Sequence, residues 1–154
     1  MFQGHKLAAN LAKQGIPTTL VPDSSIFALM PRVNKVLLGT SLVLGDGGIR
    51  GVTGSHSLTL CAKHHAVPVI VLAPSYKFSP RYGIEQTSNL HVSPHGVLSH
   101  FISNVHVHNP AFDYVPPEYI TLILSNMGGY EASFTYLLLR ELYGSTDITS
   151  EVVH

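Results

Sequence analysis

Charged residues are scarce in this sequence. They make up 12% of its 154 residues, whereas an ordinary soluble domain has about 25%. Lys and Arg together number 9, as do Asp and Glu, so the formal net charge is zero. Because nucleic acids and acidic membranes attract proteins with a basic surplus, this balance argues against both as direct partners. A hydrophobic content of 45% with so little charge indicates a surface partly covered by other protein chains, and we expect an oligomer or self-association.

Cysteine and long apolar runs are also lacking. The single cysteine, Cys61, excludes an internal disulfide and fits a reducing compartment, so a cytoplasmic location is expected. No run of eighteen apolar residues is present, which argues against a membrane span. The first fifteen residues have helical periodicity and no apolar segment of the signal-peptide kind. We interpret this start as a cut through a longer polypeptide.

Short apolar runs alternate with helical patterns along the chain. Strands are predicted at residues 18–23, 35–39, 67–73 and 120–126. Helices are predicted before Gly15 and at residues 26–30, 55–65 and 131–143. This alternation is typical of βαβ units, so residues 1–154 are predicted to form one α/β domain with a Rossmann-like, doubly wound, mostly parallel sheet. Residues 74–103 are expected to be loops with a short helix at 94–102, residues 104–110 a short strand, and residues 145–154 a frayed tail.

A glycine-rich segment, GDGGIRGVTG at residues 45–54, follows the second predicted strand. Ligands bind in such loops of α/β sheets, and the backbone N–H groups of Gly47, Gly48, Gly54 and Ser55 could hold an anion. Neither dinucleotide nor P-loop spacing occurs, since Arg50 stands where the last glycine of the dinucleotide pattern should be. Two interpretations remain open: an anion site, or a tight turn that needs glycine for a positive φ.

Other reactive side chains lack partners at a defined spacing. Cys61 has an inward helical phase, which favours a small buried hydrophobe over a nucleophile. His106 and His108 alternate on one predicted strand without a carboxylate or cysteine at ligand spacing, so no metal and no cofactor is expected. Asp23 is interpreted as a helix cap and Asp113 as part of a structural turn.

Three segments carry a family resemblance. QGHKLAANLAKQGIPTTLVPDSSIFALM, VNKVLLGTSLVLGDGGIRGVTGSHSLTLCAKHHAVPVIVLAP and FDYVPPEYITLILSNMGG cover most of the chain. They resemble the C-terminal domain of the regulatory subunits of eukaryotic translation initiation factor 2B, most of all the beta type. The same superfamily contains sugar-phosphate isomerases, such as methylthioribose-1-phosphate isomerase.

The resemblance supplies a test for catalysis. It implies that the isomerases carry a catalytic aspartate where this chain has Ser41, and an Asn-Lys pair where it has Gly51 and Val52. Because a hydroxyl cannot replace a proton-shuttling carboxylate, these positions are interpreted as a vestigial pocket without catalytic residues. The alternative is an active isomerase of methylthioribose 1-phosphate or ribose 1,5-bisphosphate, or a relative that binds a sugar phosphate. A nucleotide sensor is a weaker third possibility.

The resemblance also implies partners. The chain would be the C-terminal domain of a longer subunit with a helical N-terminal domain, pairing with alpha- and delta-type subunits in a complex with gamma and epsilon types. That complex exchanges guanine nucleotide on initiation factor 2 and responds to its phosphorylation, with the exchange module in the epsilon subunit. From their position alone, at the carboxyl end of the sheet or near a turn, eight residues are predicted as partner contacts: His106, His108, Phe112, Tyr114, Asn126, Gly128, Gly129 and Tyr130.

Overall fold

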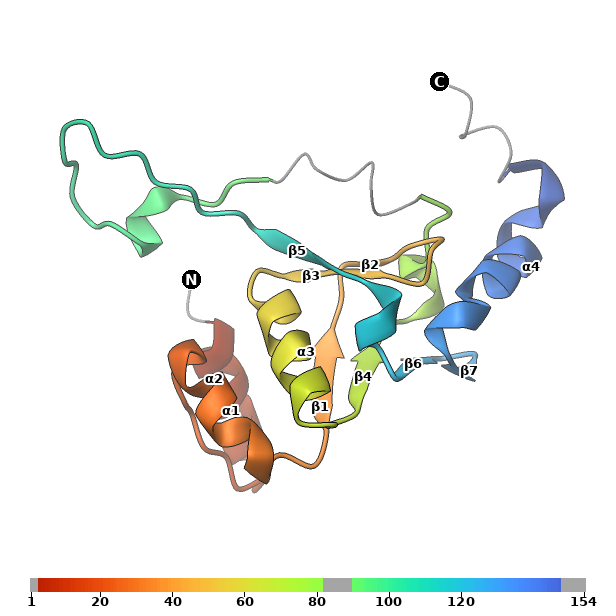
Figure 1. Ribbon diagram of the computed structural model, residues 1–154, viewed down its shortest axis with the longest axis horizontal. Helices are drawn as coiled ribbons and strands as arrows, with labels where there is room; N and C mark the ends of the chain where they lie inside the picture. The colour runs from red at the N-terminus through yellow and green to blue at the C-terminus, as the bar shows by residue number, and fades with distance from the viewer. Residues whose placement is uncertain (1–2, 82–89, 148–154) are drawn as a thin grey trace.

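The computed structural model describes residues 3–81 and 90–147. The helices are α1 (Gln3–Lys13), α2 (Ile26–Leu29), α3 (Ser55–His64) and α4 (Thr135–Asp147). The strands are β1 (Val36–Gly39), β2 (Leu42–Val43), β3 (Ile49–Val52), β4 (Val69–Leu72), β5 (Phe112–Val115), β6 (Leu122–Ser125) and β7 (Gly128–Tyr130). Figure 1 shows α1 and α2 at one end of the molecule, α4 at the other, and the segment 90–110 extending away from both sheets.

A four-stranded, mostly parallel sheet lies at the centre, in the order β1-β4-β6-β7. β1, β4 and β6 are parallel, and β7 returns antiparallel to β6 as a hairpin. The three parallel strands are the continuous apolar runs of the sequence, as expected for strands buried inside an α/β domain. The predicted fold class, α/β with a Rossmann-like, mostly parallel sheet, is confirmed.

A second, antiparallel sheet has the order β2-β3-β5, which the sequence did not predict. The glycine-rich segment 45–54 was predicted as a loop, but it contains the turn of a hairpin and the strand β3. Gly47 has φ 82° and donates its N–H to the carbonyl of Leu44, which closes the turn. Residues 112–119, predicted as a turn-rich approach, begin with β5, which pairs with β3.

Two predicted strands are wrong. In the range predicted as a strand at 18–23, residues 18–22 are extended and exposed without belonging to a strand, and Asp23 begins a 3-10 turn. Residues 104–109 also form no strand, and Pro110 makes only an isolated bridge with His91. Both runs have strand-like composition, but a strand needs a neighbour for its backbone hydrogen bonds. Within the described residues, β1 pairs with β4 alone, so its outer edge is unpaired.

The helices follow the predictions with shifts at their ends. α1 ends before Gly15, whose φ of 75° fits a helix C-terminus. The helix predicted at 94–102 is reduced to a single turn, Pro94–Gly96. The last helix is preceded by a 3-10 turn at Ala132–Phe134, and α4 is assigned through a kink at Gly144 (φ 73°, ψ 163°) to Asp147. The remainder of the predicted frayed tail lies outside the described residues.

The core lies on one face of the parallel sheet. Val36 and Val69 pack with Ala62 of α3 and Met30, next to α2. Further along the same face a second cluster joins the two sheets and α4, and its members include Val43, Ile49, Val71, Phe78, Val115, Ile123, Leu138 and Leu139. α3 and α4 thus cover the same side of the sheet.

The opposite face of the parallel sheet remains accessible. Side chains alternate along a strand, so Leu37, Leu72 and Leu124 point away from the core. They are 63%, 47% and 37% exposed, respectively. Parallel sheets are normally covered on both faces, and this face therefore differs from the rest of the fold. Within the described residues the helices are also too short or too polar to cross a bilayer.

Candidate functional site

The residues that follow β1 meet the hairpin strand β3 at the carboxyl edge of the parallel sheet. The N–H of Ser41 donates to the carbonyl of Arg50 over 2.9 Å. The Ser41 hydroxyl donates to the same carbonyl, also over 2.9 Å, and accepts from Arg50 Nε at 3.1 Å. The hydroxyl of the buried Thr40 lies 2.9 Å from that carbonyl too. Ser41 is therefore held inside the junction of the two sheets.

The two other positions of the predicted pocket lie on β3. Gly51 is buried, and a Cβ added to it would lie 2.6 Å from Ser55 Oγ. A side chain at Gly51 would therefore require the side chain of Ser55, at the start of α3, to move. Val52 is 53% exposed and pairs with Phe112 of β5. Ser41 is hydrogen-bonded to Arg50, the residue that precedes Gly51 on β3. Val52 is the last residue of β3.

Two cationic side chains lie beside Ser41. Lys77, in the 3-10 turn after β4, donates from Nζ to the carbonyl of Thr40 over 2.6 Å. The Arg50 guanidinium carbon lies 4.5 Å above the centre of the Phe112 ring, a cation–π geometry. Sequence reasoning missed Lys77, although its place directly after a buried strand put it at the ligand-binding edge of the sheet.

The N-terminus of α3, one part of the predicted anion loop, already faces a carboxylate. Asp113 Oδ2 on β5 accepts hydrogen bonds from the N–H of Gly54 (2.6 Å) and of His56 (3.4 Å). A negative charge at this position caps the orphan donors of the helix and complements its dipole. The sequence predicts only a turn at Asp113 and does not indicate its contact with Gly54, 59 residues earlier.

The other part of the predicted anion loop also serves packing. Gly48 donates its N–H to Asp46 Oδ1 over 2.9 Å, so this donor is engaged within the turn. A Cβ at Gly47 would lie 2.2 Å from the carbonyl oxygen of Ala132, and one at Gly48 would lie 2.6 Å from the Tyr114 ring. The missing side chain at Gly47 lets Ala132 approach, and the missing side chain at Gly48 lets the Tyr114 ring approach. These contacts favour the tight-turn interpretation over an anion site.

Tyr114 connects β5 to the hairpin. Its hydroxyl donates to Asp46 Oδ2 over 2.7 Å. Burial raises the pKa of Tyr114 strongly, and the hydrogen bond to Asp46 raises it further, because both disfavour the phenolate. Tyr114, predicted as a partner contact, is thus a half-buried internal donor.

The remaining predicted contact residues differ in their surroundings. Phe112 and Tyr130 are half-buried, and the Tyr130 hydroxyl donates to the carbonyl of Met127. Asn126 accepts the Ser75 N–H through Oδ1 at 2.8 Å, which ties the ends of β4 and β6 together. Gly128 and Gly129 are exposed on β7, and His106 and His108 are exposed in the extended segment. The structure does not bring these eight residues into one patch.

Among the described residues no group of three His, Cys, Asp or Glu side chains could hold a metal ion. His108 Nδ1 lies 3.3 Å from His91 Nε2, which makes a two-histidine contact. Cys61 is half-buried against the cluster formed by α2, α3 and β1. The predicted Asp23 cap is not found either: the short helical turns there have no side-chain cap, and Ser25 Oγ donates to the carbonyl of Pro22 instead.

The sequence matches the initiation factor 2 subunit family over residues 1–132. The chain belongs to this family. Over 155 aligned positions it is 43% identical to translation initiation factor eIF2B subunit beta of Dictyostelium discoideum, covering 97% of this chain and 40% of that protein. This identity confirms the predicted resemblance to the beta-type regulatory subunits.

The relatives of this initiation factor 2 subunit family member also include enzymes. It is 32% identical to ribose 1,5-bisphosphate isomerase of Archaeoglobus fulgidus, over 99% of this chain and 50% of that enzyme. The structure of 5-methylthioribose 1-phosphate isomerase from Pyrococcus horikoshii shares the fold, with a TM-score of 0.77 at 24% identity, over 86% of this chain and 39% of that chain. The chain thus spans half or less of the length of each of these relatives.

Proposed function

We propose that this chain is a non-catalytic domain of a beta-type subunit of translation initiation factor eIF2B. The higher identity to a beta subunit, 43% against 32% for an isomerase, supports this assignment. The observation that carries it is Ser41, which occupies the position where the resemblance implies a catalytic aspartate. Its hydroxyl is engaged by Arg50 on the neighbouring strand.

Proton transfer at a sugar carbon requires a group that ionises near neutral pH. A serine hydroxyl does not, and the contacts of Ser41 with the backbone and Nε of Arg50 fix it in the sheet junction. An amide side chain at the second implied position, Gly51, would collide with the side chain of Ser55 in its present place. These two positions support a structural role for the former pocket.

The proposed role is assembly and regulation. The domain would be the C-terminal part of a longer subunit that pairs with delta- and alpha-type subunits and joins gamma and epsilon types in the cytoplasm. The complex would act on initiation factor 2 and respond to its phosphorylation. The support is the family membership together with the low charge content of the chain, which fits a surface shared with other proteins.

Co-expression with a tagged delta-type subunit tests this proposal. The chain should be retained with that subunit through size-exclusion chromatography, while an unrelated α/β domain of similar size should not. Turnover of ribose 1,5-bisphosphate or methylthioribose 1-phosphate should be undetectable. A chain that isomerises either sugar phosphate, or that never associates with a delta-type subunit, contradicts the proposal.

A sugar-phosphate-binding relative is the second candidate. Lys77 and Arg50 both lie beside Ser41 at the carboxyl edge, and two cations there favour a phosphate. Calorimetry with sugar phosphates and nucleotides separates the candidates. Binding that disappears in the Lys77→Ala variant supports the second, and absence of binding supports assembly alone.

A further inference from the structure

Histidine is concentrated in the extended segment, residues 90–110. This segment contains five of the ten histidines of the chain and no Lys, Arg, Asp or Glu. Figure 1 shows the chain turning at the far end of the segment and coming back to β5. Its ionisable side chains are therefore all imidazoles, the commonest metal ligand among protein side chains.

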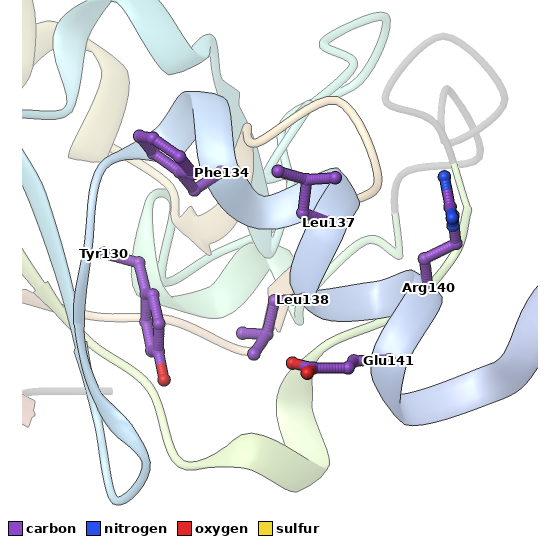
Figure 2. A pocket seen from close by; sticks show the side chains of 6 residues that line it. All are labelled: Tyr130, Phe134, Leu137, Leu138, Arg140 and Glu141. Atoms are coloured by element: carbon purple, nitrogen blue, oxygen red, sulfur yellow. The ribbon is translucent and has the colours of Figure 1, made fainter.

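Two of the hollows on the surface have similar sizes and different walls. One, of about 400 Å³, follows α4, and Figure 2 shows Tyr130, Phe134 and Arg140 among the side chains around it. The other, of about 370 Å³, lies in the extended segment, and its lining includes three of the five histidines. Of these two hollows, only the second offers imidazole ligands.

The remaining two histidines of the segment form a close pair at its base. His91 Nε2 lies 3.3 Å from His108 Nδ1. The two rings are inclined by 59°, with their centroids 5.5 Å apart. Zinc–nitrogen bonds of about 2.0–2.1 Å at a tetrahedral angle place two ligand nitrogens about 3.3–3.4 Å apart. The separation of the two ring nitrogens therefore matches that of two ligands on one tetrahedral zinc ion.

Hydrogen bonds between the two ends of the segment hold this pair in place. The N–H of Val92 donates to the carbonyl of Asn109 over 2.8 Å, and the N–H of Ala111 donates to the carbonyl of Leu90 over 2.7 Å. The Asn109 side-chain amide donates to the carbonyl of Ser93 over 3.0 Å. A metal site requires ligands that their surroundings position in advance. These three hydrogen bonds supply that positioning.

The ligand set determines which metals fit. Imidazole nitrogens suit zinc, copper and nickel, whereas magnesium and calcium prefer oxygen ligands, above all carboxylates, which the segment lacks. Both histidines are exposed, so water can fill the other two positions of a tetrahedral ion. The sequence related His108 to His106, two residues away, and predicted no metal. The structure pairs His108 with His91 instead, 17 residues away.

We propose that His91 and His108 form a two-histidine zinc site at the base of the extended segment. The ion links the two ends of the segment through side chains, in addition to their backbone hydrogen bonds. Thr53, next to the end of β3, donates from Oγ1 to the carbonyl of Pro110 over 2.6 Å, which ties this base to the antiparallel sheet. Bound zinc therefore fixes the segment relative to the domain. The inference goes beyond the proposed function and does not rest on it.

Titration calorimetry of the purified chain with zinc ions tests the site. His91→Gln and His108→Gln should each lower the zinc affinity by about tenfold or more, because one imidazole is left to hold the ion alone. His100→Gln is the matched control, since His100 is an exposed histidine of the same segment outside the pair. It should bind zinc like the wild type, and magnesium ions should not bind. Circular dichroism without zinc should show every variant folded.

Amide hydrogen exchange followed by NMR locates the bound ion. Saturating zinc should slow the exchange of the Val92 and Ala111 amides several-fold, because both donate across the base of the segment. The same zinc concentration should leave these amides unchanged in His91→Gln. This measurement separates the proposed site from zinc held by the histidines outside the extended segment.

Four results overturn the proposal. They are the absence of zinc binding, an affinity that neither His91→Gln nor His108→Gln lowers, a loss in His100→Gln as large as that in His91→Gln, and zinc binding that leaves the Val92 and Ala111 amides unchanged. Retention with a delta-type subunit is measured separately, so each of these results leaves the proposed function intact.

Discussion

The two faces of the parallel sheet are built from the same kinds of residue and differ in what covers them. Ile123 and Leu124 are neighbours on β6, yet Ile123 is fully buried and Leu124 is 37% exposed. α3 and α4 both lie on the face of Ile123, together with the antiparallel sheet. Apolar composition therefore identifies a strand, whereas its neighbours decide which of its side chains contribute to stability.

The largest expected effect comes from this pair of neighbours. Ile123→Ala removes a fully buried side chain from the main cluster and should lower the free energy of unfolding by about 2–5 kcal/mol. Leu124→Ala removes a side chain of the same size from the open face and should cost less than about 1 kcal/mol. Urea unfolding of both variants measures the contrast. Equal losses would mean that the two faces are equally covered in solution.

Gly47→Ala tests how the covered face is closed by the last helical segment. The new Cβ would meet the carbonyl oxygen of Ala132 at 2.2 Å and would also force a positive φ. A loss of about 2–4 kcal/mol is expected from strain and overpacking together. Gly15→Ala is the control, because φ is also positive at Gly15 but a Cβ added there would have no neighbouring atom within 4 Å. Thermal melts should show a clearly smaller shift for that variant.

Asp113→Ala tests how α3 is held over the same face. Loss of the carboxylate leaves the N–H groups of Gly54 and His56 without their acceptor. The expected cost is about 1 kcal/mol, as for other helix caps. Hydrogen exchange of the Gly54 amide should accelerate, whereas Asp113→Asn keeps an acceptor and should behave nearly as the wild type. An unchanged exchange rate in the alanine variant would count against the cap.

The smallest effect concerns Tyr114, on the strand that completes the antiparallel sheet. Tyr114→Phe should cost less than about 1 kcal/mol at neutral pH. Because the folded state raises the pKa of Tyr114, the stability it contributes is complete below the ordinary tyrosine value of about 10 and is lost as the pH rises above it. In chemical unfolding measured from neutral to alkaline pH, the free energy of unfolding of the variant should fall less steeply with pH than that of the wild type. An identical decline would place the titration elsewhere.

The parallel strands could be predicted because each is a continuous apolar run with the length of a strand. The wrong strand prediction at residues 18–23 has a physical cause: Leu20 and Val21 have strand-like side chains, but the described residues provide no neighbouring strand for their backbone. The second sheet was missed because β3 pairs with β5, whose residues are about sixty positions later. The composition of a short segment does not indicate a partner strand so distant in the sequence.

The candidate site was predictable in position and not in contacts. The sequence placed Ser41 and the glycine-rich segment at the carboxyl edge of the sheet. It did not show that Arg50 would hold the Ser41 hydroxyl, or that Asp113 would reach Gly54. Glycines that suit an anion loop equally suit the close approach of a carbonyl or a ring, as at Gly47 and Gly48. Only the neighbours distinguish the two uses.

The pairing of β3 with β5 has a consequence for synthesis on the ribosome. β5 (Phe112–Val115) leaves the ribosome after the β2–β3 hairpin, α3 and β4. Until then the hairpin lacks the third strand of its sheet. During that interval the start of α3 has no carboxylate from Asp113. Closing so long a loop is entropically costly and slow. The nascent chain therefore exposes an unfinished sheet edge for the time needed to translate about sixty codons, several seconds at ordinary elongation rates.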